Sequence, residues 1–305
     1  MYLEKDLDMK KILVLAVCLM PTVGFALDTP HETKFDLNIR RIGVDWTKTS
    51  VGNAAEYADS PVSAFTASDQ DSFVGVFDTA LEYGFDRLRW DNSLFMTYGK
   101  STIKPYNAPA TTDEKADKIL FTSDLSYACW DWDTVKLGPI VRAEYESEFK
   151  GNPHIRKIAR PSAGIALFDH KVLKTLYMTA VYENDFTYTH DPVSKFAVEA
   201  GWRAEYDVRE GVKFTSDGYY REYLDYSKYV PTDFKRDLSA TARLDTNLWG
   251  DFTFGPYVNY RRALSRRAND MESKPYASNM TVGLSFNYIN KFNLKRAESL
   301  SDESK

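Results

Sequence analysis

Residues Phe196–Tyr206 read FAVEAGWRAEY, and this stretch decides the fold. Its even-numbered residues are apolar or aromatic, whereas its odd-numbered residues include Glu199, Arg203 and Glu205. Successive residues of a β-strand face opposite sides, so the stretch predicts a strand with one apolar and one charged face. It is about twice the usual strand length of five or six residues. That is the length of about 9–11 residues that a tilted strand needs to cross a bilayer.

The same alternation recurs along the rest of the chain. It is clear in Asp237–Leu248, Phe252–Arg261 and Met280–Tyr288. Eight weaker stretches follow it too: Phe35–Trp46, Ser72–Tyr83, Arg87–Tyr98, Lys118–Trp130, Val135–Tyr145, Arg160–Leu167, Val172–Tyr182 and Val212–Tyr223. The first of these changes phase at Arg40 and Arg41, which predicts a β-bulge. With Phe196–Tyr206 they make about twelve strands.

The connections between these strands alternate between two kinds. Short turns are predicted at 84–86, 131–133, 168–170, 207–211 and 249–250. Longer polar segments are predicted at 47–71, 99–116, 146–159, 183–194, 224–236 and 262–277. Short turns at one rim and long loops at the other are typical of bacterial outer-membrane barrels, as is an even number of strands. The sequence therefore predicts an all-β fold, a 12-stranded antiparallel up-and-down transmembrane β-barrel with both termini on the periplasmic side.

The N-terminus has the features of an export signal. Lys10 and Lys11 precede an apolar run over Ile12–Met20, and Gly24-Phe25-Ala26 supplies small residues at a cleavage site. We expect a signal peptide over residues 1–26, with Met9 as a possible true start, because residues before Met9 are acidic. The barrel is expected over 27–292, and a charged periplasmic tail over 293–305.

Composition narrows the class of protein. Mean hydropathy is −0.45, and the only long apolar run is the N-terminal one, which is too short for a membrane-spanning helix. Residues 1–26 carry three acids and three lysines, so the net charge is −5 with or without them. This negative charge does not indicate a protein that binds nucleic acid. No glycine-rich phosphate loop and no Cys–His cluster occurs. We therefore predict no cofactor, no metal and no catalytic residue.

The last predicted strand carries a short motif. Thr281, Gly283, Phe286 and Tyr288 are spaced as polar-x-Gly-x-x-apolar-x-aromatic. This resembles the C-terminal signal that bacterial outer-membrane β-barrels present to their insertion machinery. The resemblance implies export to the outer membrane and contact with that machinery.

A second stretch resembles a group of bacterial outer-membrane barrels of unassigned function. It comprises Trp90–Leu94, then Tyr98-Gly99, then Asp117–Ile119. This resemblance covers about thirty residues, and it implies fold and location without implying a substrate.

The polar faces of the predicted strands carry nearly equal numbers of basic and acidic residues. We take ten of them as candidates to line the lumen: Arg89, Lys136, Arg142, Glu144, Glu199, Arg203, Glu205, Arg243, Asp245 and Arg261. An excess of basic residues would favour anions, and no such excess occurs. The prediction is a porin-like channel for passive diffusion of small hydrophilic solutes through a narrow, mixed-charge lumen. The same charges could instead fill the lumen and serve stability alone.

Two other functions stay open. An adhesive or structural barrel would act through the long loops 47–71 and 262–277, and the arginines at 262, 266 and 267 could hold lipopolysaccharide phosphates. A barrel hydrolase would need a histidine in an outer loop, such as His190 beside Asp191. The expected partners are outer-membrane lipid and lipopolysaccharide, the insertion machinery and small solutes, and no nucleic acid.

Overall fold

The computed structural model describes residues 33–57, 63–65, 69–104, 111–132, 134–150, 154–188, 191–228, 233–265 and 276–294. The expected signal peptide lies outside the described residues. Of the expected tail, only residues 293 and 294 are described, and Asn293 is the last residue of a strand. Both segments remain predictions.

Strands make up nearly all of the described chain. They are β1 (Thr33–Gly52), β2 (Asp69–Phe85), β3 (Leu88–Lys104), β4 (Thr111–Tyr127), β5 (Trp130–Trp132), β6 (Val135–Ser147), β7 (Lys157–Phe168), β8 (Leu173–Asp185), β9 (Val193–Arg209), β10 (Val212–Tyr226), β11 (Phe234–Trp249), β12 (Phe252–Ser265) and β13 (Ala277–Asn293). Two short 3-10 helices, η1 (Ala54–Tyr57) and η2 (Ser63–Phe65), follow β1. Among the described residues, no helix is long and apolar enough to cross a membrane.

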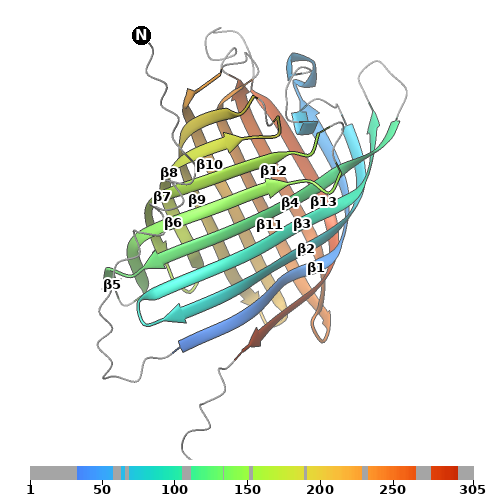
Figure 1. Cartoon of the computed structure of the whole chain (residues 1–305). Coiled ribbons are helices and arrows are strands. Elements are labelled where there is room, and N and C mark those ends of the chain that lie inside the picture. Colours follow the sequence, from blue (N-terminus) through green and yellow to red (C-terminus); the bar gives the residue numbers. More distant parts are fainter. Residues whose placement is uncertain are drawn as a thin grey trace, which may run out of the picture. The chain divides into compact units, whose positions relative to one another are not determined.

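The strands form a closed ring (Figure 1). Each long strand pairs antiparallel with the next, and β1 pairs with β13. The short β5 continues β4 along the same edge of β6, so the two count as one strand of the ring. The predicted 12-stranded antiparallel barrel is thereby confirmed. Closure satisfies the backbone hydrogen bonds of every strand, which a sheet with free edges cannot do in hydrocarbon.

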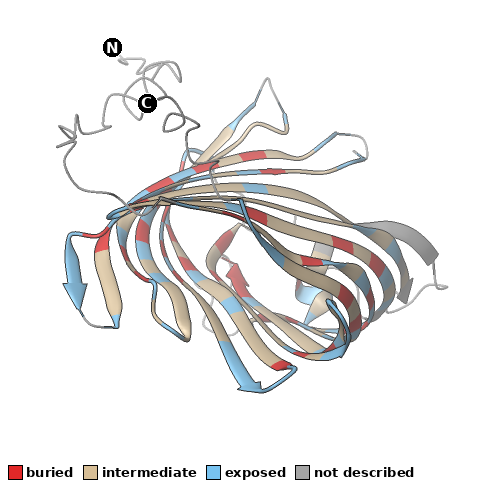
Figure 2. Cartoon of the chain, turned by 90° about the horizontal axis from the view of Figure 1, so that it is seen from below, coloured by how far each residue is buried: buried red, intermediate tan, exposed pale blue. Residues whose placement is uncertain are grey.

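The polarity of the wall is the reverse of that in a soluble protein. Buried positions on the strands include Asp36, Glu183, Glu199, Asp237 and Asn287, whereas large apolar side chains are exposed. Buried and exposed residues alternate along the strands in Figure 2. The exposed apolar set includes Trp46, Phe73, Val141, Ile165, Met178, Phe254, Val282 and Leu284. An apolar outer face around a polar interior is the arrangement of transmembrane β-barrels.

The predicted bulge in β1 is confirmed. Pairing of β1 shifts register between Ile39 and Ile42 against β13, and between Ile39 and Arg41 against β2. The shift changes the phase of the strand, so that Ile42, Val44 and Trp46 are exposed while Arg41 is buried.

The two rims differ as the sequence predicts, but several strands are longer than predicted. We call the rim with connections 86–87, 133–134, 169–172, 210–211 and 250–251 the turn rim. The rim with connections 53–68, 105–110, 148–156, 186–192, 227–233 and 266–276 is the loop rim. The predicted loop 99–116 is wrong, because β3 runs to Lys104 and β4 starts at Thr111. Beyond the bilayer both faces of a strand meet water, so alternation ends while backbone pairing continues.

Three aromatic residues lie flat over glycines of the neighbouring strand. Tyr177 is paired in register with Gly201, and Tyr257 with Gly283, while Trp202 is paired with Gly218. A Cβ atom added at Gly201 would lie 2.4 Å from Cζ and Oη of Tyr177. Glycine at 201 therefore makes room for the ring, whose hydroxyl donates to Glu199 at 2.8 Å and whose face receives the Arg142 guanidinium at 4.0 Å.

We expect Gly201→Ala to lower the free energy of unfolding by about 1–3 kcal/mol, because the new methyl displaces the Tyr177 ring and breaks both contacts. Urea unfolding of the refolded barrel in detergent measures the loss. The control is Gly75→Ala, where the nearest atom to a new Cβ lies at an ordinary 3.6 Å. Equal stability of the two variants would contradict the role given to Gly201.

Candidate functional site: the charged interior

A ladder of ion pairs crosses the inward faces of β6 to β10. Arg160 Nη1 lies 2.8 Å from Glu146 Oε2, and Arg160 Nε lies 2.6 Å from Glu183 Oε2. Glu183 also pairs with Lys195 at 2.9 Å and with Arg221 at 3.4 Å. We call these ion pairs, centred on Arg160 and Glu183, the ladder. Each pair joins neighbouring or next-neighbouring strands, so the ladder stabilises this part of the wall.

The ladder is packed away from water. The Glu183 side chain is 3% exposed and that of Arg221 is 6% exposed. Arg221 Nε donates to Glu199 Oε2 at 2.6 Å, and its guanidinium lies 5.1 Å from the centre of the Tyr219 ring. Buried carboxylates persist only when they are paired and hydrogen-bonded, as these are.

A second set of inward charges lies on β1 and on β11 to β13. Arg41 pairs with Asp45 and donates from Nε to Asn287 Oδ1 at 2.7 Å. Asn287 donates in turn to Asp245 at 3.4 Å, and Arg243 Nε lies 2.6 Å from Asp245 Oδ2. These contacts tie β1 to β13 and, through Asn287, to β11.

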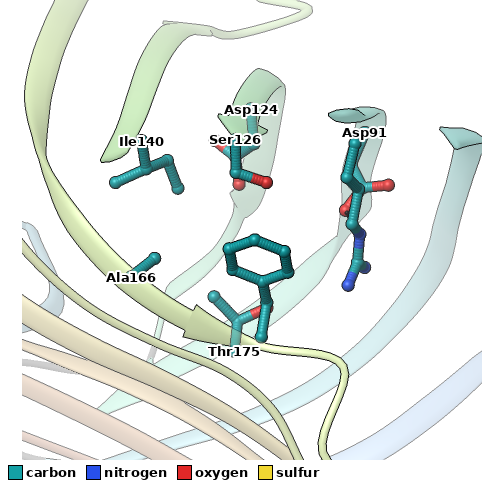
Figure 3. A pocket seen from close by; sticks show the side chains of 8 residues that line it. Asp91, Asp124, Ser126, Ile140, Ala166 and Thr175 are labelled. Carbon is teal, nitrogen blue, oxygen red and sulfur yellow. Dashed lines mark ion pairs between the residues drawn. The ribbon is translucent and has the colours of Figure 1, made fainter. Parts of the chain in front are cut away.

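The turn at 169–172 contributes to the interior near the turn rim. Asp169 has a left-handed backbone (φ 65°) and accepts from Arg89 of β3 at 2.9 Å, while Lys136 of β6 lies 3.1 Å away. Beside them is a pocket (Figure 3) with Asp91 on one side and Ile140 on the other. Its lining consists of Arg89, Asp91, Asp124, Ser126, Ile140, Ala166, Phe168 and Thr175.

Four inward residues, which we call the waist, meet partway along the barrel: Arg40, Asp78, Arg203 and Asp217. Arg40 Nη1 lies 3.8 Å from Asp78 Oδ1, and Asp217 on β10 is paired in register with Arg203 on β9. Asp78 on β2 and Arg203 on β9 stand on opposite sides of the ring. The waist therefore presents both signs of charge from opposite sides of the ring.

The waist differs from the ladder in its access to water. The Arg203 side chain is 30% exposed and that of Asp78 is 24% exposed, and Asp217 ranks among the exposed residues. These side chains point inward from the middle of their strands. Their exposed surface therefore faces the space that the wall encloses. The interior is consequently not filled by side chains at this level.

The segment after β1 folds into the barrel near the loop rim. We call its described residues 53–57 and 63–65 the inner loop. Tyr57 and Phe65 are fully buried, in a cluster with Val181, Ala197, Tyr223, Tyr226, Phe234, Ala263 and Ala277. The Phe65 ring meets the Phe234 ring edge-on at 5.7 Å, and Asn279 Nδ2 donates to the Ala64 carbonyl at 2.7 Å.

The ten lumen candidates from the sequence all lie on the inward side and all take part in ion pairs or hydrogen bonds. Arg142 holds both oxygens of Asp124 at 2.6 Å, and Arg261 holds both oxygens of Asp237. Glu144 lies 3.9 Å from Arg142, and Arg203 lies 3.2 Å from Glu205. Arg89, Lys136, Glu199, Arg243 and Asp245 have the partners given above.

Sequence reasoning missed several inward residues. Glu146 lies in a segment that the sequence predicts to be a loop, and Arg41 lies at the predicted bulge. The sequence therefore does not predict which face of the wall either side chain takes. Tyr57 and Phe65 lie in a polar segment that gave no sign of folding inward. One signal was available: Val181 and Tyr177 are bulky residues on an otherwise polar face, and Val181 packs in the cluster that holds the inner loop.

The residues of the predicted insertion signal have structural contacts of their own. Thr281 Oγ1 lies 2.7 Å from Thr49 Oγ1, and Gly283 makes room for Tyr257. Phe286 and Tyr288 join Trp249 and Phe252 in an aromatic cluster at the turn rim. Recognition by the insertion machinery remains a prediction.

The described histidines have local roles. His170 Nδ1 accepts from the backbone amides of Val172 and Leu173 at 3.3 and 3.1 Å, which shapes the turn. His154 meets the Tyr188 ring edge-on at 4.9 Å. His31 and His190 lie outside the described residues. Within the described part of the chain, no group of three or more histidine, cysteine or acidic side chains is placed to hold a metal ion.

The ring is closed, has an even number of strands, and has an apolar outer face and a polar inner face. Its short turns and long loops lie at opposite rims, and this combination of features is that of outer-membrane β-barrels. The chain is an outer-membrane β-barrel. No protein-family model matches its sequence, and no curated protein does.

Solved structures similar to this barrel include channels and an enzyme. An outer membrane channel from Pseudomonas putida F1 has a TM-score of 0.46 and 11% identity, over 86% of this chain and 97% of that one. Outer membrane phospholipase A from Escherichia coli has a TM-score of 0.43 and 11% identity, over 82% and 90%. The NanC porin has a TM-score of 0.38 and 11% identity, over 80% and 98%. At such low identity the similarity says nothing about what this barrel does.

We expect Glu183→Gln to lower the free energy of unfolding by about 3–5 kcal/mol, because it leaves Arg160, Lys195 and Arg221 without their shared buried carboxylate. Urea titration of the folded barrel in lipid vesicles measures the loss. The control is Asp207→Asn, whose side chain is 81% exposed at the turn rim. A change below about 1 kcal/mol at 183 would show that the ladder contributes little to stability.

Proposed function

We propose that this barrel allows passive diffusion of small hydrophilic solutes across the outer membrane. The observation that carries the proposal is the water-accessible waist, where Arg203 and Asp78 remain partly exposed inside the wall. A barrel whose ion pairs served stability alone would have them as tightly packed as Glu183 and Arg221. The ladder on β6 to β10 braces one side of the wall, and the solute path runs past the waist.

The waist sets the selectivity in this proposal. It carries two arginines and two aspartates, so a passing ion meets both signs of charge at close range. Balanced charge in a narrow space favours small polar or zwitterionic solutes and gives weak preference between anions and cations. The ten lumen candidates carry both signs of charge, which agrees with weak selectivity.

Planar-bilayer recording of the purified barrel tests the proposal. We expect a steady conductance, and we expect Arg203→Gln combined with Arg243→Gln to move the reversal potential in a KCl gradient toward cation selectivity. The two changes remove the ion-pair partners of Glu205 and Asp245, and they leave Arg40 as the one arginine of the waist beside Asp78 and Asp217.

The matched control for selectivity is Arg87→Gln with Arg209→Gln, because these two exposed arginines lie at the turn rim, away from the waist. A wild-type barrel that never conducts would overturn the channel proposal. An unchanged reversal potential in the Arg203 and Arg243 variant would show that ions do not pass the waist.

The inner loop narrows the path near the loop rim. We expect Tyr57→Ala combined with Phe65→Ala to raise the single-channel conductance at least twofold, because both rings are removed from the interior and the loop loses its apolar anchors. Phe254→Ala, on the lipid-facing side, is the control and should leave conductance unchanged. Equal conductance in the double variant and the wild type would remove the inner loop from the path.

A further inference from the structure

On several strands the outward face changes from apolar to charged toward the loop rim. On β12 Tyr260 is followed, on the same face, by Arg262, and on β11 Leu238 is preceded by Arg236. On β10 Tyr220 is followed by Glu222, and on β1 the exposed Trp46 is followed by Lys48. Because the apolar band must lie in hydrocarbon, these charges lie at the level of the lipid head groups.

The two arginines, Arg236 and Arg262, contact the same tyrosine. The Arg262 guanidinium carbon lies 4.0 Å from the centre of the Tyr276 ring, and Arg236 Nη1 donates to the Tyr276 hydroxyl at 3.3 Å. Arg261 pairs inward with Asp237, so Arg262, the next residue of the strand, points outward. The tyrosine thus holds both guanidinium groups side by side on the outer surface.

The patch keeps spare positive charge. One carboxylate, Glu222, lies in it, accepting from Tyr220 at 2.6 Å and from Arg236 at 3.3 Å. Arg262 is exposed and contacts no carboxylate among the described residues. Stacking uses the face of its guanidinium, which leaves the N–H edge open to a ligand.

We propose that Arg236 and Arg262 bind a phosphate group of the glycolipid in the outer leaflet, with Tyr276 positioning both arginines. Guanidinium donors match phosphate oxygens in a two-pronged geometry. Tyr260 lies two residues before Arg262 on the same face of β12, and Leu238 is paired in register with Arg262. Both apolar side chains therefore adjoin the patch, where the acyl chains of the same lipid would pack. A ligand with a phosphate above and hydrocarbon below therefore fits the surface better than a free anion does.

The test measures binding of purified lipid A to the folded barrel in detergent by native mass spectrometry. The variant is Arg236→Gln with Arg262→Gln, and the matched control is Arg87→Gln with Arg209→Gln, which removes two exposed arginines at the turn rim. We expect the apparent Kd for diphosphorylated lipid A to rise at least tenfold in the variant and to stay within twofold in the control. Lipid A stripped of its phosphates should bind both alike and weakly.

Three outcomes overturn the proposal. Equal affinity of variant and control would show that the pair does not contact the phosphate. Undiminished binding of dephosphorylated lipid A would assign the surface to acyl chains alone. Displacement of lipid A by inorganic phosphate at equal concentration would indicate a site for soluble anions. Heat-modifiable migration on gels confirms that each variant is folded, and none of these results depends on whether the barrel conducts.

Discussion

Everything in this molecule follows from the need to pair each backbone amide and carbonyl where no water is present. Twelve strands meet that need only by closing on themselves, and the pairing of β1 with β13 and of β4 with β6 completes the ring. Closure fixes which side chains face inward. Because the outer face must be apolar, nearly all charge in the spanning region is confined to a small enclosed volume.

That confinement produces two kinds of charged structure in one lumen. On β6 to β10 the charges pack into a dry ladder around Glu183 and Arg221, where desolvation is offset by several partners for each group. At the waist the same residue types stay partly wet, because opposing strands leave room between them. The inner loop adds a third element, an apolar cluster at the loop rim that reduces the interior cross-section. The same residue types thus form a dry set of ion pairs on β6 to β10 and a partly exposed set at the waist, and only their packing differs.

Much of the fold could be predicted from the sequence, because alternation directly encodes which face each residue takes. The strands, the bulge at Arg41 and the sorting of connections between two rims all follow from that pattern. Strand ends at the loop rim could not be predicted, since alternation disappears once both faces are solvated. The partners of each charge also escaped prediction: Arg160 meets Glu183 and Glu146 only through the register of three strands. The docking of Tyr57 and Phe65 depends on residues more than a hundred positions away, which no local pattern reports.

The seam between β1 and β13 joins the two ends of the barrel sequence. Thr49 meets Thr281 there, and the inner loop that follows β1 rests on residues of β11, β12 and β13. Strands late in the sequence thus form part of the surface against which the inner loop packs. A chain that lacks β13 can neither close its hydrogen-bonded ring nor complete the cluster around that segment, which includes Ala277.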